Sequence, residues 1–148
     1  MTATAYGATS PVYHATVTMD KNNNAEVRII EKNKGSVREV QEYMIRKTTL
    51  PEVVESIADE TNVSYGKAVK FTEVKYPRMK FEKNASKDIK VTNRISKGMV
   101  VMNVTRDGTT KEYWFSKSNI KEASDKIARI YRLSNKTVWE SVKANRAN

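Results

Sequence analysis

The sequence predicts an α+β protein in which antiparallel β-hairpins form a sheet packed against about four helices. Three observations lead to this fold class: stretches with apolar residues at every second position, stretches with apolar residues three and four positions apart, and the hairpin-turn pair Asp107-Gly108. A chain of 148 residues can bury one core but not two. We therefore expect a flexible N-terminal tail over residues 1–10 and a single domain over 11–148.

The N-terminal elements follow from hydrophobic spacing. Residues 13–19 alternate apolar and polar side chains, which is typical of a half-buried strand, and residues 25–31 repeat this pattern after a polar loop. A helix is predicted over residues 36–47, because Ser36 and Glu39 have capping-box spacing and apolar residues follow at helical intervals. The first part of the chain is thus expected to be a hairpin followed by a helix.

A second helix is predicted over residues 51–60. Pro51 suits the first turn of a helix, because the backbone N–H that proline lacks would find no partner there. One side of this helix is apolar. The other side is acidic and carries Glu52, Glu55, Asp59 and Glu60.

The middle of the chain is predicted to be β-structure. Gly66 and the alternation that follows it favour a strand over residues 64–71. Two further strands, near residues 78–81 and 89–92, are expected to pair as a hairpin with a basic outer face. That face would carry Arg78, Lys80 and Lys90.

The C-terminal part is predicted to be a hairpin followed by two helices. Alternating strands flank Asp107-Gly108, and Asn119 with Glu122 has capping-box spacing at the start of a helix. The helical spacing is interrupted at residues 133–135, before a last helix over 136–143. Hairpin–helix–helix therefore occurs twice, which allows two ββαα-like halves and an internal duplication as a hypothesis.

Positive charge is concentrated in the second half of the chain, whose formal net charge is +10 in total. Residues 1–74 contain 9 Lys and Arg against 10 Asp and Glu, whereas residues 75–148 contain 18 against 7. A protein with this charge repels itself unless an anion is near, and segregated positive charge is typical of a phosphate-binding face. The sequence therefore predicts a polyanionic partner, with nucleic acid as the first choice.

The main functional motif lies in the last two predicted helices. Residues 127–138 read IARIYRLSNKTV and resemble the core of bacterial helix-turn-helix DNA-binding segments, a resemblance that extends over residues 120–145. In that family a small residue lets the helices cross closely, an apolar residue followed by Ser forms the turn, and an inward aliphatic residue anchors the recognition helix. These positions are occupied by Ala128, Leu133, Ser134 and Val138.

The resemblance implies that the exposed side of the last helix contacts duplex DNA. Asn and Lys side chains are suited to base edges, and Lys and Arg side chains to phosphate oxygens. With the basic strands of the middle segment included, the predicted nucleic-acid-binding residues are Arg78, Lys80, Lys90, Arg129, Arg132, Asn135, Lys136, Lys143 and Arg146.

The motif departs from the family pattern at three positions. Arg132 stands where the turn usually holds Gly, Ser141 stands where an apolar residue is usual, and Glu140 would face the phosphates. A weaker match over residues 57–64 lies among acidic residues, and we interpret it as structural.

Little in the sequence supports catalysis, a metal site or a cofactor. The chain has a single histidine, His14, and no cysteine, so His-rich and Cys-rich metal sites are excluded, and no Gly-rich phosphate loop is present. One alternative remains: Asp59 with Glu73 and Lys75 resembles the Asp…Glu-x-Lys arrangement of Mg²⁺-dependent nucleases. Another is a stacking surface for single-stranded bases at Trp114.

We therefore predict a non-catalytic, cofactor-free protein that binds nucleic acid, with duplex DNA favoured over RNA. It would be a small regulator or accessory factor of phage or mobile-element type, and a homodimer is compatible with the sequence. With no signal peptide and no long apolar stretch, a cytoplasmic location and no membrane contact are expected. The alternative from another class is an inhibitor or adapter of a host protein machine that docks through the acidic helix over residues 51–60.

Overall fold

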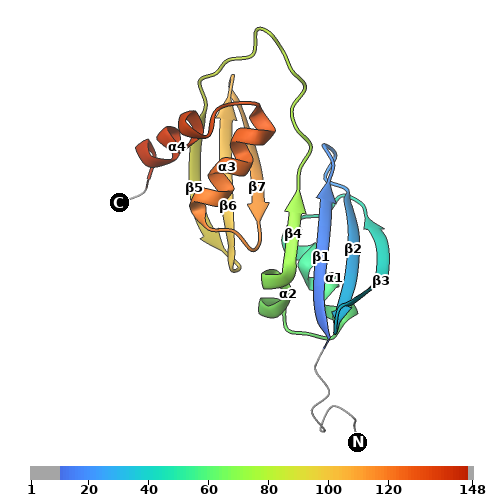
Figure 1. Cartoon of the computed structure of the whole chain (residues 1–148). Helices are drawn as coiled ribbons and strands as arrows, with labels where there is room; N and C mark the ends of the chain where they lie inside the picture. The colour runs from blue at the N-terminus through green and yellow to red at the C-terminus, as the bar shows by residue number, and fades with distance from the viewer. Residues whose placement is uncertain (1–10, 147–148) are drawn as a thin grey trace, which may run out of the picture. The chain divides into compact units, whose positions relative to one another are not determined.

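The chain divides into two compact units, Met1–Lys75 and Tyr76–Asn148 (Figure 1). The computed structural model describes residues 11–146, so the tail expected over residues 1–10 lies outside the described residues. Each unit has a sheet and two helices, which confirms the predicted α+β class and the predicted number of about four helices. A single domain was expected over residues 11–148. The structure instead groups into two compact units, and each is described by itself below.

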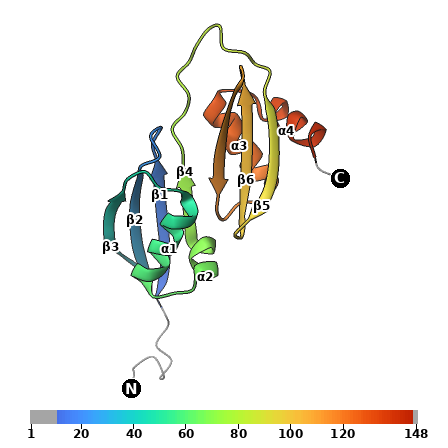
Figure 2. The same cartoon turned by 180° about the vertical axis from the view of Figure 1, so that it is seen from behind.

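Unit 1 is a four-stranded sheet with two helices on one face (Figure 2). The strand order is β3-β2-β1-β4, with antiparallel neighbours except for β4, which is parallel to β1. The buried side chains of the sheet include Val17, Val27 and Val74, which pair in register and lie on the same face as the helices. The elements are β1 Val12–Met19, β2 Ala25–Asn33, β3 Ser36–Ile45, α1 Leu50–Thr61, α2 Tyr65–Phe71 and β4 Thr72–Lys75.

Unit 2 is a three-stranded antiparallel sheet, β5-β6-β7, with α3 and α4 following it in the chain. The hairpin turn at Asp107-Gly108 is confirmed: both residues have positive φ, and Arg106 pairs with Thr109 across it. The capping box at Asn119 and Glu122 is confirmed as well. The elements are β5 Lys90–Ser96, β6 Met99–Arg106, β7 Thr109–Phe115, α3 Ile120–Tyr131 and α4 Asn135–Ala144.

The two units share one order of elements: three antiparallel strands, a helix, a short turn and a second helix. The helix pairs also correspond in position. The first helix runs from Leu50 to Thr61 in unit 1 and from Ile120 to Tyr131 in unit 2, an offset of 70 positions in the numbering at both ends. Each unit thus contains one more strand before its helices than the predicted ββαα pattern.

The predicted helix over residues 36–47 is wrong, because this segment is β3. Lys34 and Gly35 both have positive φ, at 48° and 85°, which makes a two-residue hairpin turn rather than a helix-breaking loop. Ser36 donates its hydroxyl hydrogen to the carbonyl of Asn33 at 2.8 Å and caps the turn, not a helix. This segment pairs with β2 along the whole length of that strand, and the pairing outweighs the helical spacing of its apolar residues.

The predicted strand over residues 64–71 is also wrong, because it forms the helix α2. The Ser64 hydroxyl accepts a hydrogen bond from the backbone N–H of Lys67, as an N-cap does, and Ala68 and Val69 are buried. The strand near residues 78–81 does not form either. The segment over residues 89–92 leads into β5, which pairs with β6 instead.

Candidate nucleic-acid interface

The turn between α3 and α4 is formed by a left-handed residue and a serine cap. Arg132 is in the left-handed region, with φ 57° and ψ 40°, at the position where glycine is usual. The backbone N–H of Leu133 donates to the carbonyl of Ala128 at 2.9 Å and closes the end of α3. The Ser134 hydroxyl then accepts from the N–H of Thr137 at 3.1 Å and caps the start of α4.

Small and aliphatic side chains hold the two helices together. Ile127 and Ala128 of α3 and Val138 and Val142 of α4 all have no exposed surface. These residues lie on the inner sides of their helices, so the opposite sides are free to face solvent. The first turn of α4 contains no acidic residue, and both Asn135 and Lys136 are exposed there. The positive end of this helix dipole therefore points outward together with a cation.

Arginines gather at the C-terminal end of α3. The Arg78 Nε donates to the carbonyl of Arg129 at 3.2 Å, and the Arg132 Nε donates to the carbonyl of Met79 at 2.7 Å. The N–H of Met79 also donates to the carbonyl of Ile130 at 2.8 Å. These bonds dock residues 78–79 on the helix end. The side-chain bonds of Arg78 and Arg132 each use only the Nε–H. The four N–H donors on the two Nη atoms of each guanidinium are not used in these bonds.

The turn between β6 and β7 contributes another cation to the same end of unit 2. The guanidinium carbon of Arg106 lies 5.0 Å from the centre of the Tyr131 ring, and Tyr131 is the last residue of α3. Sequence reasoning missed Arg106, although its place directly before the Asp107-Gly108 turn was a usable signal. We call these residues the basic cluster: Arg78, Arg106, Arg129, Arg132 and Lys136.

The other predicted contacts are already engaged or lie outside the helix pair. The Lys143 Nζ is 3.8 Å from the Glu140 carboxylate, so its charge is partly offset. Trp139 is half-buried, with Lys121 Nζ 5.3 Å and the Arg146 guanidinium carbon 5.9 Å from its ring centre. Two remaining predicted residues are exposed outside the helix pair: Lys80 and Lys90.

Ser141 departs from the family pattern for a structural reason. Its hydroxyl donates to the carbonyl of Ile89 at 3.1 Å and accepts from the N–H of Val91 at 2.9 Å. The side chain therefore satisfies backbone groups of the edge strand β5, which a valine or leucine could not do. The apolar contact expected there is made by Val142, one position later.

The aromatic residues of β7 are divided between the two faces of the sheet, as alternation predicts. Tyr113 and Phe115 are buried on the helix side, and burial raises the pKa of Tyr113 above its ordinary value. Trp114 lies on the other face, where its Nε1 donates to the Glu112 carboxylate at 2.7 Å and the Arg94 guanidinium lies 5.7 Å from its ring. Trp114, the centre of the predicted stacking surface, is half-buried and already contacts Glu112 and Arg94.

The residues of the nuclease alternative lie on opposite sides of unit 1. Asp59 belongs to α1, which packs on the face of Val17 and Val74. Glu73 pairs in register with Thr16, so its side chain points to the other face, where the His14 Nε2 is 3.9 Å away. Among residues 11–146, no three His, Cys, Asp or Glu side chains are grouped as a metal ion would require.

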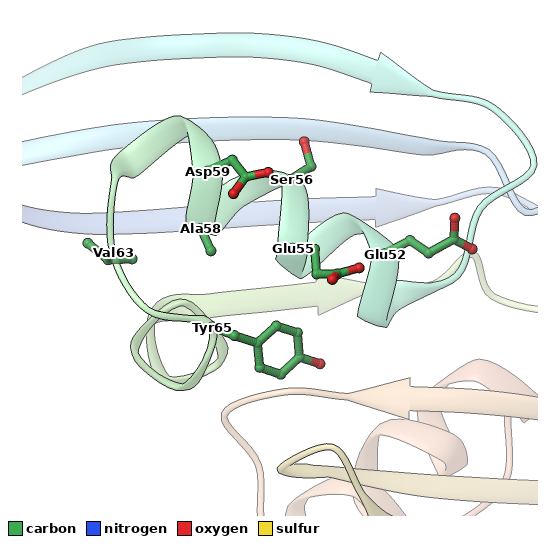
Figure 3. A pocket seen from close by; sticks show the side chains of 7 residues that line it. All are labelled: Glu52, Glu55, Ser56, Ala58, Asp59, Val63 and Tyr65. Carbon is green, nitrogen blue, oxygen red and sulfur yellow. The ribbon is translucent and has the colours of Figure 1, made fainter.

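An acidic concavity lies on the helices of unit 1 (Figure 3). It is shallow, about 530 Å³ in volume, and lined by Glu52, Glu55 and Asp59 of α1 and by Tyr65 at the start of α2. The Tyr65 hydroxyl is buried without a hydrogen-bond partner among the described residues. Burial and the nearby Glu55 carboxylate raise the pKa of Tyr65.

Comparisons with known proteins assign no family. No protein-family model matches the sequence, and no curated protein sequence matches it. Two solved structures described as an Aquifex aeolicus PPX-GPPA enzyme and a Ppx/GppA family member match with TM-scores of 0.30 and identities of 9% and 10%. The alignments cover 89% and 78% of this chain but 61% and 54% of those chains, and scores this low support no conclusion about fold or function. In residues 11–146, no helix is long and apolar enough to cross a membrane.

Proposed function

We propose that unit 2 binds duplex DNA without catalysis, as the binding part of a small regulator or accessory factor. The observation that carries the proposal is the distribution of charge between two units that share the order of three antiparallel strands and two helices. Unit 1 contains 10 Lys and Arg against 10 Asp and Glu, whereas unit 2 contains 17 against 7. The whole net charge of +10 therefore belongs to unit 2. A phage or mobile-element origin and action in the host cytoplasm remain parts of this proposal.

The basic cluster supports a division of roles within the interface. Asn135 and Lys136 are exposed in the first turn of α4, and their amide and ammonium groups suit adenine and guanine edges in the major groove. Arg129 and Arg132 are exposed at the C-terminal end of α3, and their guanidinium groups suit phosphate oxygens. Phosphate contacts would supply most of the affinity, and the two residues of α4 would supply sequence preference.

The test is binding of labelled duplex DNA, followed by fluorescence anisotropy between about 50 and 200 mM salt. We expect affinity to fall steeply as salt increases, because each phosphate contact releases counterions. A double variant, Arg129→Ala/Arg132→Ala, should lower the slope of log affinity against log salt by about 2, since each lost phosphate contact removes about one unit.

The matched control is Lys67→Ala/Lys70→Ala, which removes two cations from α2, the unit 1 counterpart of α4. This variant should leave both affinity and salt slope unchanged. Equal losses in the two variants would mean that the attraction is a property of total charge. Absence of any salt-sensitive binding to duplex DNA, single-stranded DNA or RNA would contradict the proposal.

A second candidate function rests on the acidic concavity of unit 1. Three carboxylates facing a shallow hollow suit a basic segment of a partner protein, as an adapter or inhibitor of a host machine would require. Titration of a labelled oligolysine peptide would test this surface. Binding that is lost in Glu52→Gln/Glu55→Gln, but kept in a Glu26→Gln control on β2, would support it; equal binding by both variants would exclude it.

A further inference from the structure

Phe81 is the most exposed of the exposed large hydrophobic side chains among residues 11–146, at 76%. It belongs to the segment over residues 76–89, which joins β4 to β5 and contains no helix or strand (Figure 1). An exposed phenylalanine loses the stabilisation that burial of its ring would provide. Its neighbours in sequence are Lys80 and Glu82, followed by Lys83, and all three are exposed. An aromatic ring between cations is a combination suited to nucleic acid, in which bases and phosphates alternate.

The beginning of this segment is fixed to unit 2. The Tyr76 hydroxyl donates to the carbonyl of Trp114 at 2.9 Å and accepts from its N–H at 2.8 Å. Further along, the N–H and carbonyl of Met79 bond to Ile130 and to the Arg132 side chain. Met79 is the last of these anchors before Phe81, which lies two residues further along the chain. The backbone that carries Phe81 is therefore tied to the turn that precedes α4.

This anchoring places the exposed ring within reach of the basic cluster. Two residues of extended chain span at most about 7 Å, so the backbone of Phe81 lies within that distance of Met79. The Met79 carbonyl is in turn 2.7 Å from the Arg132 Nε. A duplex held by the basic cluster would therefore lie within reach of Phe81.

We propose that residues 80–83 form a second DNA-contacting element, in which Phe81 inserts as an apolar wedge between stacked bases while Lys80 and Lys83 bind the flanking phosphates. Apolar wedges of this kind unstack a base step and kink the duplex. The inference rests on the proposed function, because it needs a duplex bound at the basic cluster. It adds a contact that depends on base stacking rather than on charge.

The test compares Phe81→Ala with the full-length wild-type chain in duplex binding across the same salt series. Loss of one base–aromatic contact should weaken binding about 5- to 150-fold. The salt slope should stay as in the wild type, because no cation is removed. Phe81→Trp should retain most of the affinity. Circular dichroism should show no change in folding, since the ring is exposed in the free protein.

A second readout reports the insertion itself. Wild-type protein should increase the fluorescence of a duplex carrying 2-aminopurine in place of adenine at several positions, because unstacking relieves quenching. Phe81→Ala at saturating concentration should not. The matched control is Ile95→Ala, which removes another exposed apolar side chain of unit 2, 64% exposed, and should behave as wild type.

The outcomes separate this inference from the function on which it rests. Salt-sensitive duplex binding that is equally strong in Phe81→Ala, with the same 2-aminopurine signal, would overturn the wedge and leave the proposed function standing. A Phe81-dependent loss limited to single-stranded DNA would overturn insertion into a duplex. Absence of nucleic-acid binding by the wild type would overturn both.

Discussion

Unit 1 and unit 2 arrange their strands and helices in the same order but differ in surface charge. Both contain three antiparallel strands followed by a helix pair, and both helix pairs turn through a left-handed residue and a serine cap. Their charges differ by ten, since unit 1 is neutral and unit 2 carries +10. Buried positions therefore set the topology, while exposed positions are free to differ between the units.

Corresponding positions of the two helix pairs show how the charge difference arises. Asp59 of unit 1 stands where unit 2 has Arg129, and Asn62 stands where unit 2 has Arg132. Buried counterparts instead stay similar, as with Ile57 and Ile127, neither of which has any exposed surface. Unit 1 thus serves as an internal reference for unit 2, with similar packing and without the proposed phosphate contacts.

The largest expected effect is on stability and should be equal in the two units. Ile57→Ala and Ile127→Ala each remove a fully buried side chain from the helix pair and leave a cavity. Each should lower the free energy of unfolding by about 2–5 kcal/mol, measured by urea denaturation. If one of the two substitutions costs less than about 1 kcal/mol, the two helix pairs do not pack equivalently.

The next effect is on binding and should be limited to unit 2. Exchange of Arg129→Asp and Arg132→Asn gives unit 2 the residues of unit 1 at these positions and should weaken duplex binding at least about tenfold, or 1.4 kcal/mol. The reverse exchange in unit 1, Asp59→Arg and Asn62→Arg, adds the same charge to the other unit. Full recovery of binding when both exchanges are combined would show that net charge, not the helix pair of unit 2, sets the affinity.

The smallest expected difference concerns helix capping. Asn119 accepts a hydrogen bond from the N–H of Glu122 at 2.8 Å, whereas Thr49 makes no side-chain cap bond to the backbone of α1. Asn119→Ala should therefore cost about 1 kcal/mol of stability, and Thr49→Ala only a few tenths. Thermal unfolding followed by circular dichroism would measure both. Equal costs would mean that the Thr49 contact with the Glu52 side chain stabilises α1 as well as a complete capping box does.

Predictions from the sequence were confirmed where a short residue pattern is compatible with only one local structure. The Asp107-Gly108 pair gave the β6–β7 hairpin, and the reciprocal hydrogen bonds of Asn119 and Glu122 start α3 as their spacing indicates. Predictions failed where one pattern suits two structures. Ser36 and Glu39 have the same spacing as a capping box, but Ser36 follows the Lys34-Gly35 turn and belongs to a strand.

The candidate interface was predictable in part. The two C-terminal helices and their caps could be predicted from the sequence, because capping and the spacing of buried positions are local properties. The gathering of Arg78 and Arg106 around the end of α3 was not, since both are distant from it in the chain and reach it through contacts with Arg129 and Tyr131. The exposure of Phe81 was also missed, because alternation near residues 78–81 had suggested a strand.

By itself, the sequence determined the α+β class, the helix pair over residues 120–144 and the concentration of positive charge in the second half of the chain. Composition and local spacing are enough for these properties. Only the tertiary structure decided that residues 36–45 form a strand, that residues 65–71 form a helix and that the segment after Lys75 docks on α3. These three features depend on partners distant in sequence or on burial against a core. The spacing of neighbouring residues encodes neither the distant partners nor the burial.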